Sequence, residues 1–187
     1  MLYIAAAGLA LLLVAFIVWR HISSRRRGRI EDITGMISGR NLLAQWPYTP
    51  EEWRQAAEDE FDWVRNKGGA GNVYVSQGAI YILGETDERF IDLAADGRVV
   101  THASCRASHM SPLKLRLRWK VERYDENGRT EVKYYKEDLR IPVPLAHHEE
   151  ARRVADYFTA RMENNPEAYT ALVPDDEPIS LFGKDSF

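Results

Sequence analysis

Cysteine is almost missing from this chain of 187 residues, because Cys105 is the single one. One cysteine excludes an internal disulfide, which suits a reducing compartment. Cys105 lies in a strand-like stretch near His102 and His109, but the odd spacing from His102 puts the two side chains on opposite strand faces. We therefore interpret Cys105 as a small, partly buried structural residue rather than as a nucleophile.

Charged side chains are missing from the first nineteen residues, Met1–Trp19. As a helix this stretch would be about 28 Å long, close to the hydrocarbon thickness of a bilayer. Tyr3 and Trp19 lie near its two ends, where aromatic rings prefer the membrane interface. A cleaved signal peptide is the alternative, but it needs a basic start, a shorter apolar core and a small-residue cleavage site. We expect residues 1–19 to be a retained transmembrane anchor.

Familiar catalytic and metal-binding motifs are missing as well. The sequence contains no G-x-S-x-G and no H-E-x-x-H. His147 and Glu150 have helical i, i+3 spacing, but no further ligand follows, so a solvated helix start is favoured over a metal site. The glycine-rich stretch NKGGAGN lies between a predicted helix and a strand, the reverse of a phosphate-binding loop. The sequence predicts no enzyme and no cofactor, with an unrecognised hydrolase as one alternative.

A basic cluster directly follows the apolar run, formed by Arg20, Arg25, Arg26, Arg27 and Arg29. Basic residues stay on the cytoplasmic side, so we expect a single-pass protein of a bacterial-type inner (plasma) membrane with its amino terminus outside. The cluster would also contact anionic membrane lipids, at about 1 kcal/mol per residue. Beyond it, 20 basic residues face 28 acidic ones, a formal net charge of −8. An acidic body argues against nucleic acid as a partner.

Residues 20–47 are predicted to be a basic juxtamembrane segment and linker, and residues 48–163 a cytoplasmic domain that begins and ends with a helix. In the first helix Thr49 is the N-cap, Pro50 follows, and Glu52 completes a capping box, with the end expected near Asn66. The second helix, residues 147–163, has one apolar stripe. The tail, residues 164–187, is expected to be extended or disordered, with Leu181 and Phe182 as candidate docking residues.

Between the helices the sequence predicts about six or seven antiparallel strands. Hairpins are expected at residues 73–83, around Asp96-Gly97, and around the DENG turn after Tyr124. The clearest strand has period-two alternation, with Leu113, Leu115, Leu117, Trp119 and Val121 on its apolar face. Thr130, Val132 and Tyr134 are expected to continue that face on the return strand. We predict an α+β fold, with an antiparallel sheet or open barrel flanked by two helices, and Trp119 and Phe158 buried near one another.

The other face of the clearest strand is basic, with Lys114, Arg116, Arg118 and Lys120. If Tyr124 pairs opposite Arg129, Lys133 and Tyr135 join this face. One interpretation is a solvated face that prevents the strand from sticking to others. The alternative is a binding face for lipid headgroups or for an acidic protein surface, acting together with Arg25, Arg26 and Arg27.

A run of antiparallel strands closed by one C-terminal helix resembles the element order of a pleckstrin-homology-like barrel, and the resemblance concerns topology alone. It implies a lipid-headgroup-binding domain as an alternative function. The function we expect is a non-enzymatic, membrane-tethered cytoplasmic interaction module, an accessory subunit of an inner-membrane protein complex. Its expected partners are membrane lipids and a membrane protein.

Overall fold

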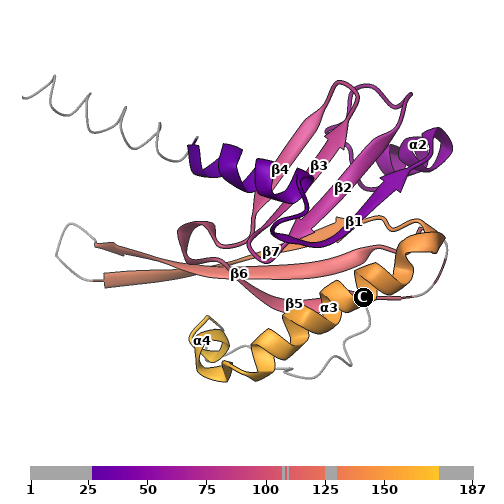
Figure 1. The fold of residues 1–187 in the computed structure, drawn as a ribbon. Helices are drawn as coiled ribbons and strands as arrows, with labels where there is room; N and C mark the ends of the chain where they lie inside the picture. The colour runs from indigo at the N-terminus through magenta and orange to yellow at the C-terminus, as the bar shows by residue number, and fades with distance from the viewer. Residues whose placement is uncertain (1–26, 107, 109, 125–129, 173–187) are drawn as a thin grey trace, which may run out of the picture. The chain divides into compact units, whose positions relative to one another are not determined.

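The computed structural model describes residues 27–106, 108, 110–124 and 130–172 (Figure 1). The chain divides into two compact units, Met1–Asn41 and Leu42–Phe187. In the first unit a helix covers residues 27–37, and Gly39 follows it with a positive φ of 76°, a conformation common just past helix ends. Within the described ranges, no helix has the length and apolarity needed to cross a bilayer. The predicted anchor, residues 1–19, lies outside them.

The second unit is an α+β domain with two antiparallel sheets, which confirms the predicted class and strand number. The first sheet has the order β1-β2-β3-β4 and the second the order β5-β6-β7 (Figure 1). The strands are β1 (Leu42–Tyr48), β2 (Gly71–Ser76), β3 (Ala79–Gly84), β4 (Glu88–Asp92), β5 (Val99–Cys105), β6 (Leu113–Tyr124) and β7 (Thr130–Ile141).

The two predicted helices are present. Helix α2 (Pro50–Asp59) begins with the expected capping box, in which the Glu52 N–H donates to Thr49 Oγ1 at 3.3 Å and the Thr49 N–H donates to Glu52 Oε2 at 2.9 Å. It ends earlier than predicted. The second predicted helix is α3 (His148–Glu163). The domain also contains a short helix, α4 (Pro166–Thr170), and two 3-10 turns, η1 (Ala95–Gly97) and η2 (Leu145–His147). Because α4 lies in the predicted tail, the first part of that tail is ordered, and residues 173–187 lie outside the description.

Strand β1 occupies residues that were predicted from the sequence to be a linker. Its buried side chains alternate, with Ala44, Trp46 and Tyr48 facing the core. Trp46 Nε1 donates to the Tyr48 hydroxyl at 3.0 Å, and that hydroxyl donates to the carbonyl of Pro142 at 2.5 Å. Burial raises the pKa of Tyr48, so its hydroxyl stays a neutral donor. These bonds fix β1 to the segment that follows β7.

The hairpin predicted around Asp96-Gly97 is wrong. Asp96 and Gly97 do turn the chain, with φ values of 55° and 76°. The strands on either side belong to different sheets, because β4 pairs with β3 and β5 pairs with β6. The turn therefore connects the two sheets instead of closing a hairpin.

One hydrophobic core lies between the sheets and includes the buried face of α3. Helix α3 packs mainly on β5 and also contacts β1, so it joins one edge of each sheet. The two sheets do not form one continuous hydrogen-bonded barrel, and α3 helps to close the core between them. Phe158 is buried as predicted, whereas Trp119 is only partly buried at the margin of the core.

Helix α2 is held on the first sheet by a close contact between Trp53 and two glycines. Gly71 and Gly84 are cross-strand partners in β2 and β3. A Cβ atom built on Gly71 would lie 2.1 Å from Trp53 Cε3, and one on Gly84 would lie 2.6 Å from Trp53 Cζ2. The indole ring therefore occupies space that any other residue at these positions would fill.

Candidate interaction surface

Strands β6 and β7 form a hairpin whose register differs by one residue from the predicted one. Each strand has twelve residues, and Tyr124 lies opposite Thr130. A shift of one residue moves every side chain of the return strand to the other face. Val132 and Tyr134 therefore share the face of the basic residues, and Lys133 and Tyr135 share the face of Trp119. The predicted placement of Lys133 with the basic residues is wrong.

We call the basic side of this hairpin the outer face, because it is opposite the buried Leu113, Leu115 and Leu117. On β6 it carries the four predicted basic residues, and each has a partner on β7. The pairs are Lys114 with Arg140, Arg116 with Asp138, Arg118 with Lys136, and Lys120 with Tyr134. The sequence pattern therefore predicted the β6 half of this face and missed the β7 half.

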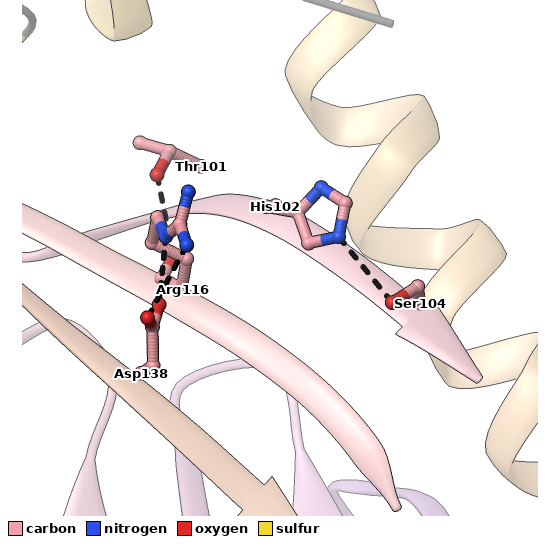
Figure 2. Close-up of polar contacts among 5 residues, drawn as sticks. All are labelled: Thr101, His102, Ser104, Arg116 and Asp138. Carbon is pink, nitrogen blue, oxygen red and sulfur yellow. Dashed lines mark hydrogen bonds and ion pairs between the residues drawn. The ribbon is translucent and has the colours of Figure 1, made fainter. Parts of the chain in front are cut away.

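Arg116 is the centre of a polar group on the outer face. Its guanidinium binds the Asp138 carboxylate through two nitrogens, at 2.7 and 3.2 Å, and the Thr101 hydroxyl donates to its carbonyl at 3.4 Å (Figure 2). His102 lies beside Arg116 on β5, with Nε2 3.3 Å from Ser104 Oγ. The hydrogen bond from Arg116 is the main reason that the pKa of Asp138 lies below its usual value. Asp138 therefore neutralises much of the charge of Arg116.

Other basic residues of the outer face also lie close to acids or are buried. Lys120 Nζ lies 3.1 Å from Glu122, and Arg140 Nε lies 2.7 Å from Glu60. The prediction that Arg118 points to solvent is wrong, because only 8% of this residue is exposed. The outer face holds six basic residues, the four on β6 with Lys136 and Arg140, and two acids, Glu122 and Asp138, and Glu60 at the end of α2 adds a third acid through its pair with Arg140. Its formal charge of +3 is a local exception in an acidic domain.

The hairpin continues well past β5, whose pairing with β6 ends at Arg118 (Figure 1). We call the projecting part, residues 119–124 and 130–136, the arm. Two of its tyrosines share the outer face, with exposed fractions of 75% for Tyr124 and 42% for Tyr134. Val132 and Tyr135 are also exposed. The arm therefore presents large apolar and aromatic side chains that the domain core does not cover.

The other face of the arm is stiffened by stacked side chains. The rings of Trp119 and Tyr135 are parallel within 13°, with centroids 5.4 Å apart. The Arg98 guanidinium lies 4.6 Å from the Trp119 ring and 3.3 Å from Glu137 Oε2. Aromatic pairs of this kind contribute about 0.5–1.5 kcal/mol beyond their buried area. The stack holds the arm rigid without burying it.

The remaining candidate residues lie apart from this surface. Arg27 is exposed in the helix of residues 27–37, while Arg25 and Arg26 lie outside the described residues. Cys105 pairs with Leu113 on the core side of β5, and burial raises the pKa of its thiol. His147 Nδ1 lies 2.6 Å from Glu150 Oε2, but the described part of the chain contains no group of three metal-binding side chains.

Comparison of the chain with protein-family models, curated proteins and solved structures gives no match. A function can therefore be inferred only from the chemistry of the surface described above.

Proposed function

We propose that this chain is a non-enzymatic, membrane-tethered interaction module, an accessory subunit of an inner-membrane protein complex. The charge-free run Met1–Trp19 with the arginines after it supports a single-pass anchor and a cytoplasmic domain. The observation that carries the proposal is the exposed arm. Contiguous apolar side chains outside the core mark contact sites, and aromatic residues together with arginine are enriched in protein interfaces.

A membrane-protein partner fits the arm better than a lipid surface does. On the outer face Tyr134 lies opposite Lys120 and two residues from Lys136, and Tyr124 lies farther along the same face, which gives a mixture of aromatic and basic groups. The arm also contains the exposed acids Glu122 and Glu131, and acidic groups there would meet the negative surface of anionic lipids unfavourably. The partner surface is expected to be apolar at its centre and acidic at its margin.

Replacing Tyr124 and Tyr134 together by serine is expected to remove the partner from the full chain extracted in mild detergent. Each change deletes an exposed aromatic ring that touches no core residue, so folding is preserved. Aromatic residues at interface hot spots usually contribute about 1–2 kcal/mol each, so the loss of two is expected to lower the affinity at least tenfold. Mass spectrometry of co-purified proteins measures the loss. Leu145→Ser is the matched control, because Leu145 is equally exposed outside the arm. Unchanged co-purification of the same proteins with the double variant would contradict the proposal.

A lipid-headgroup-binding domain is the second candidate. Seven strands in sheets of four and three precede α3, with α2 inserted between β1 and β2, so the strand number and the closing helix support this alternative. The net positive charge of the outer face supports it as well. Anionic headgroups would be held on that face by charge.

Replacing Lys120 and Lys136 together by glutamate, in a chain that starts at Leu42, tests binding to lipid. Both lysines are exposed, so their reversal leaves the core intact, whereas reversal of Arg116 would break its bidentate pair with Asp138 and reversal of Arg118 would place a carboxylate at a buried position. For a lipid-binding domain, retention on anionic liposomes falls several-fold in the double variant and falls in the parent when salt is raised. If the parent chain is not retained at low salt, the lipid function is excluded and the protein-partner function is left intact.

A further inference from the structure

The edge strands of the two sheets differ in how their free edges are protected. Strand β1 contains Pro47 and contacts α3, and α3 packs along β5. Strand β4 has only five residues, three of them charged. Strand β7 has twelve residues and contains neither proline nor glycine, and no other strand of the described chain pairs with its outer side. A long edge that no strand covers is a template for pairing with another chain.

The accessible part of this edge is continuous. Every residue from Thr130 to Lys136 is exposed, Glu137 is partly exposed, and the exposed Asp138 and Arg140 extend this stretch to the part of β7 where Leu139 and Ile141 face the core. The stack of Trp119 on Tyr135 supports the extended conformation at the end of this stretch nearest the domain, which lowers the entropy cost of adding a strand there.

We propose that two copies of this chain pair through β7 as antiparallel strands, with a two-fold axis at Tyr135. A two-fold axis between two antiparallel strands runs perpendicular to the sheet and keeps each side chain on its own face, so it must place one residue opposite its own copy. Tyr135 is next to the middle of β7, so this axis uses nearly the whole strand. It puts Lys133 opposite Glu137 of the second copy and Tyr134 opposite Lys136 of the second copy.

Neighbouring axes are disfavoured by charge. An axis at Lys133 or at Lys136 places that lysine opposite itself, and an axis at Tyr134 places Glu131 opposite Glu137. Like charges opposite one another destabilise a ladder, whereas unlike charges stabilise it. An axis at Val132 avoids repulsion but pairs only the five residues from Thr130 to Tyr134. The axis at Tyr135 alone combines an unlike-charge pair with a long ladder.

The lysines of β7 also restrict which strands this edge can pair with. Charged side chains, lysine above all, keep free edges from sticking to chance partners. In the proposed pair each lysine meets a carboxylate or an aromatic ring, so these residues exclude other chains and select a second copy. The inference goes beyond the proposed function, because it gives the hydrogen-bonding edge of the arm a role in pairing, whereas the proposed function uses the faces of the arm. The pairing needs no other protein.

Disulfide trapping in membranes tests the pairing on the full chain with Cys105→Ser as background. Paired Cα atoms are about 4.5–5.5 Å apart, within the range of a disulfide, so Tyr135→Cys is expected to give a covalent dimer on mild oxidation. Lys133→Cys alone is expected to stay monomeric, since its two copies would be about 13 Å apart along the strands. Chains with Lys133→Cys mixed with chains with Glu137→Cys are expected to cross-link, which tests the pairing without removing the Tyr135 ring.

Adding Lys133→Glu to the Tyr135→Cys chain is expected to slow cross-linking several-fold, because glutamate would face Glu137. Lys67→Glu, an exposed charge reversal outside β7, is the control and is expected to have no effect. Any one of three results would overturn the proposal. They are equal cross-linking of the Lys133→Cys and Tyr135→Cys chains, a dimer of the Val132→Cys chain, and the absence of a dimer from both the Tyr135→Cys chains and the mixed chains. Cross-linking between two copies and co-purification of a different protein are measured in separate experiments, so either proposal can fail while the other is supported.

Discussion

Gly71→Ala is expected to destabilise the domain by about 3 kcal/mol, and Gly78→Ala to leave its stability nearly unchanged. The added methyl group would lie 2.1 Å from the Trp53 ring, so the ring or β2 must move. The ring cannot move freely, because Trp53 is fully buried and packs against Tyr48 and Phe61, with centroids 5.6 and 5.8 Å away. The cost is therefore expected near the upper end of the range for overpacked cores.

Thermal unfolding of the full chain, followed by circular dichroism in mild detergent, measures this difference. A loss of about 3 kcal/mol lowers the melting temperature by roughly 10 °C in a domain of this size. Gly78 is the matched control, because a Cβ atom there meets nothing within 4 Å and its φ is not in the left-handed region. Equal melting temperatures for the two variants would contradict the packing of α2 on the sheet.

Phe158→Ala is expected to cost about 3–5 kcal/mol, enough to unfold a marginal domain. The ring is buried in the face of α3 that joins β1 to β5, and no polar group can fill the space it leaves. Trp119→Ala is expected to cost less, because it loses mainly the stack on Tyr135. That stack contributes at most about 1.5 kcal/mol beyond the contribution of the modest area that the Trp119 side chain buries.

Denaturant unfolding of the two variants compares these costs directly. The sequence pattern makes Trp119 and Phe158 equivalent core residues, whereas the structure places Trp119 at the margin where the arm begins. Unfolding midpoints that drop equally for both substitutions would contradict that placement. A larger drop for Trp119→Ala would show that the arm is covered in the native chain.

Local signals in the sequence predicted the elements that depend on local chemistry. Thr49 and Glu52 form their capping box, and the stripe that contains Val154 and Phe158 faces the core. The alternation from Leu113 to Leu117 gives the buried side of β6 correctly. Each of these features depends on residues a few positions apart, so the pattern contains the necessary information.

Features that depend on distant pairing were not predictable in the same way. The alternation of Ala44, Trp46 and Tyr48 marks β1, but Pro47 argues against a central strand, and only an edge position allows it. The register of β6 and β7 is set by the length of the turn, which the DENG motif does not fix. That one-residue error hid Tyr134 and Val132, the side chains that give the outer face of the arm its apolar character.

The bond between Tyr48 and Pro142 joins residues 94 positions apart and has a consequence for the order of folding. Strands β2 to β4 and the pair β6–β7 are made of neighbours in the sequence, so they can form soon after they leave the ribosome. Closure of the core has to wait until α3 is synthesised, because α3 joins the edges of the two sheets. The second sheet is complete at Ile141 and α3 ends at Glu163, so the nascent chain exposes the apolar sides of both sheets while roughly twenty residues are added. Chaperones bind such surfaces in this period.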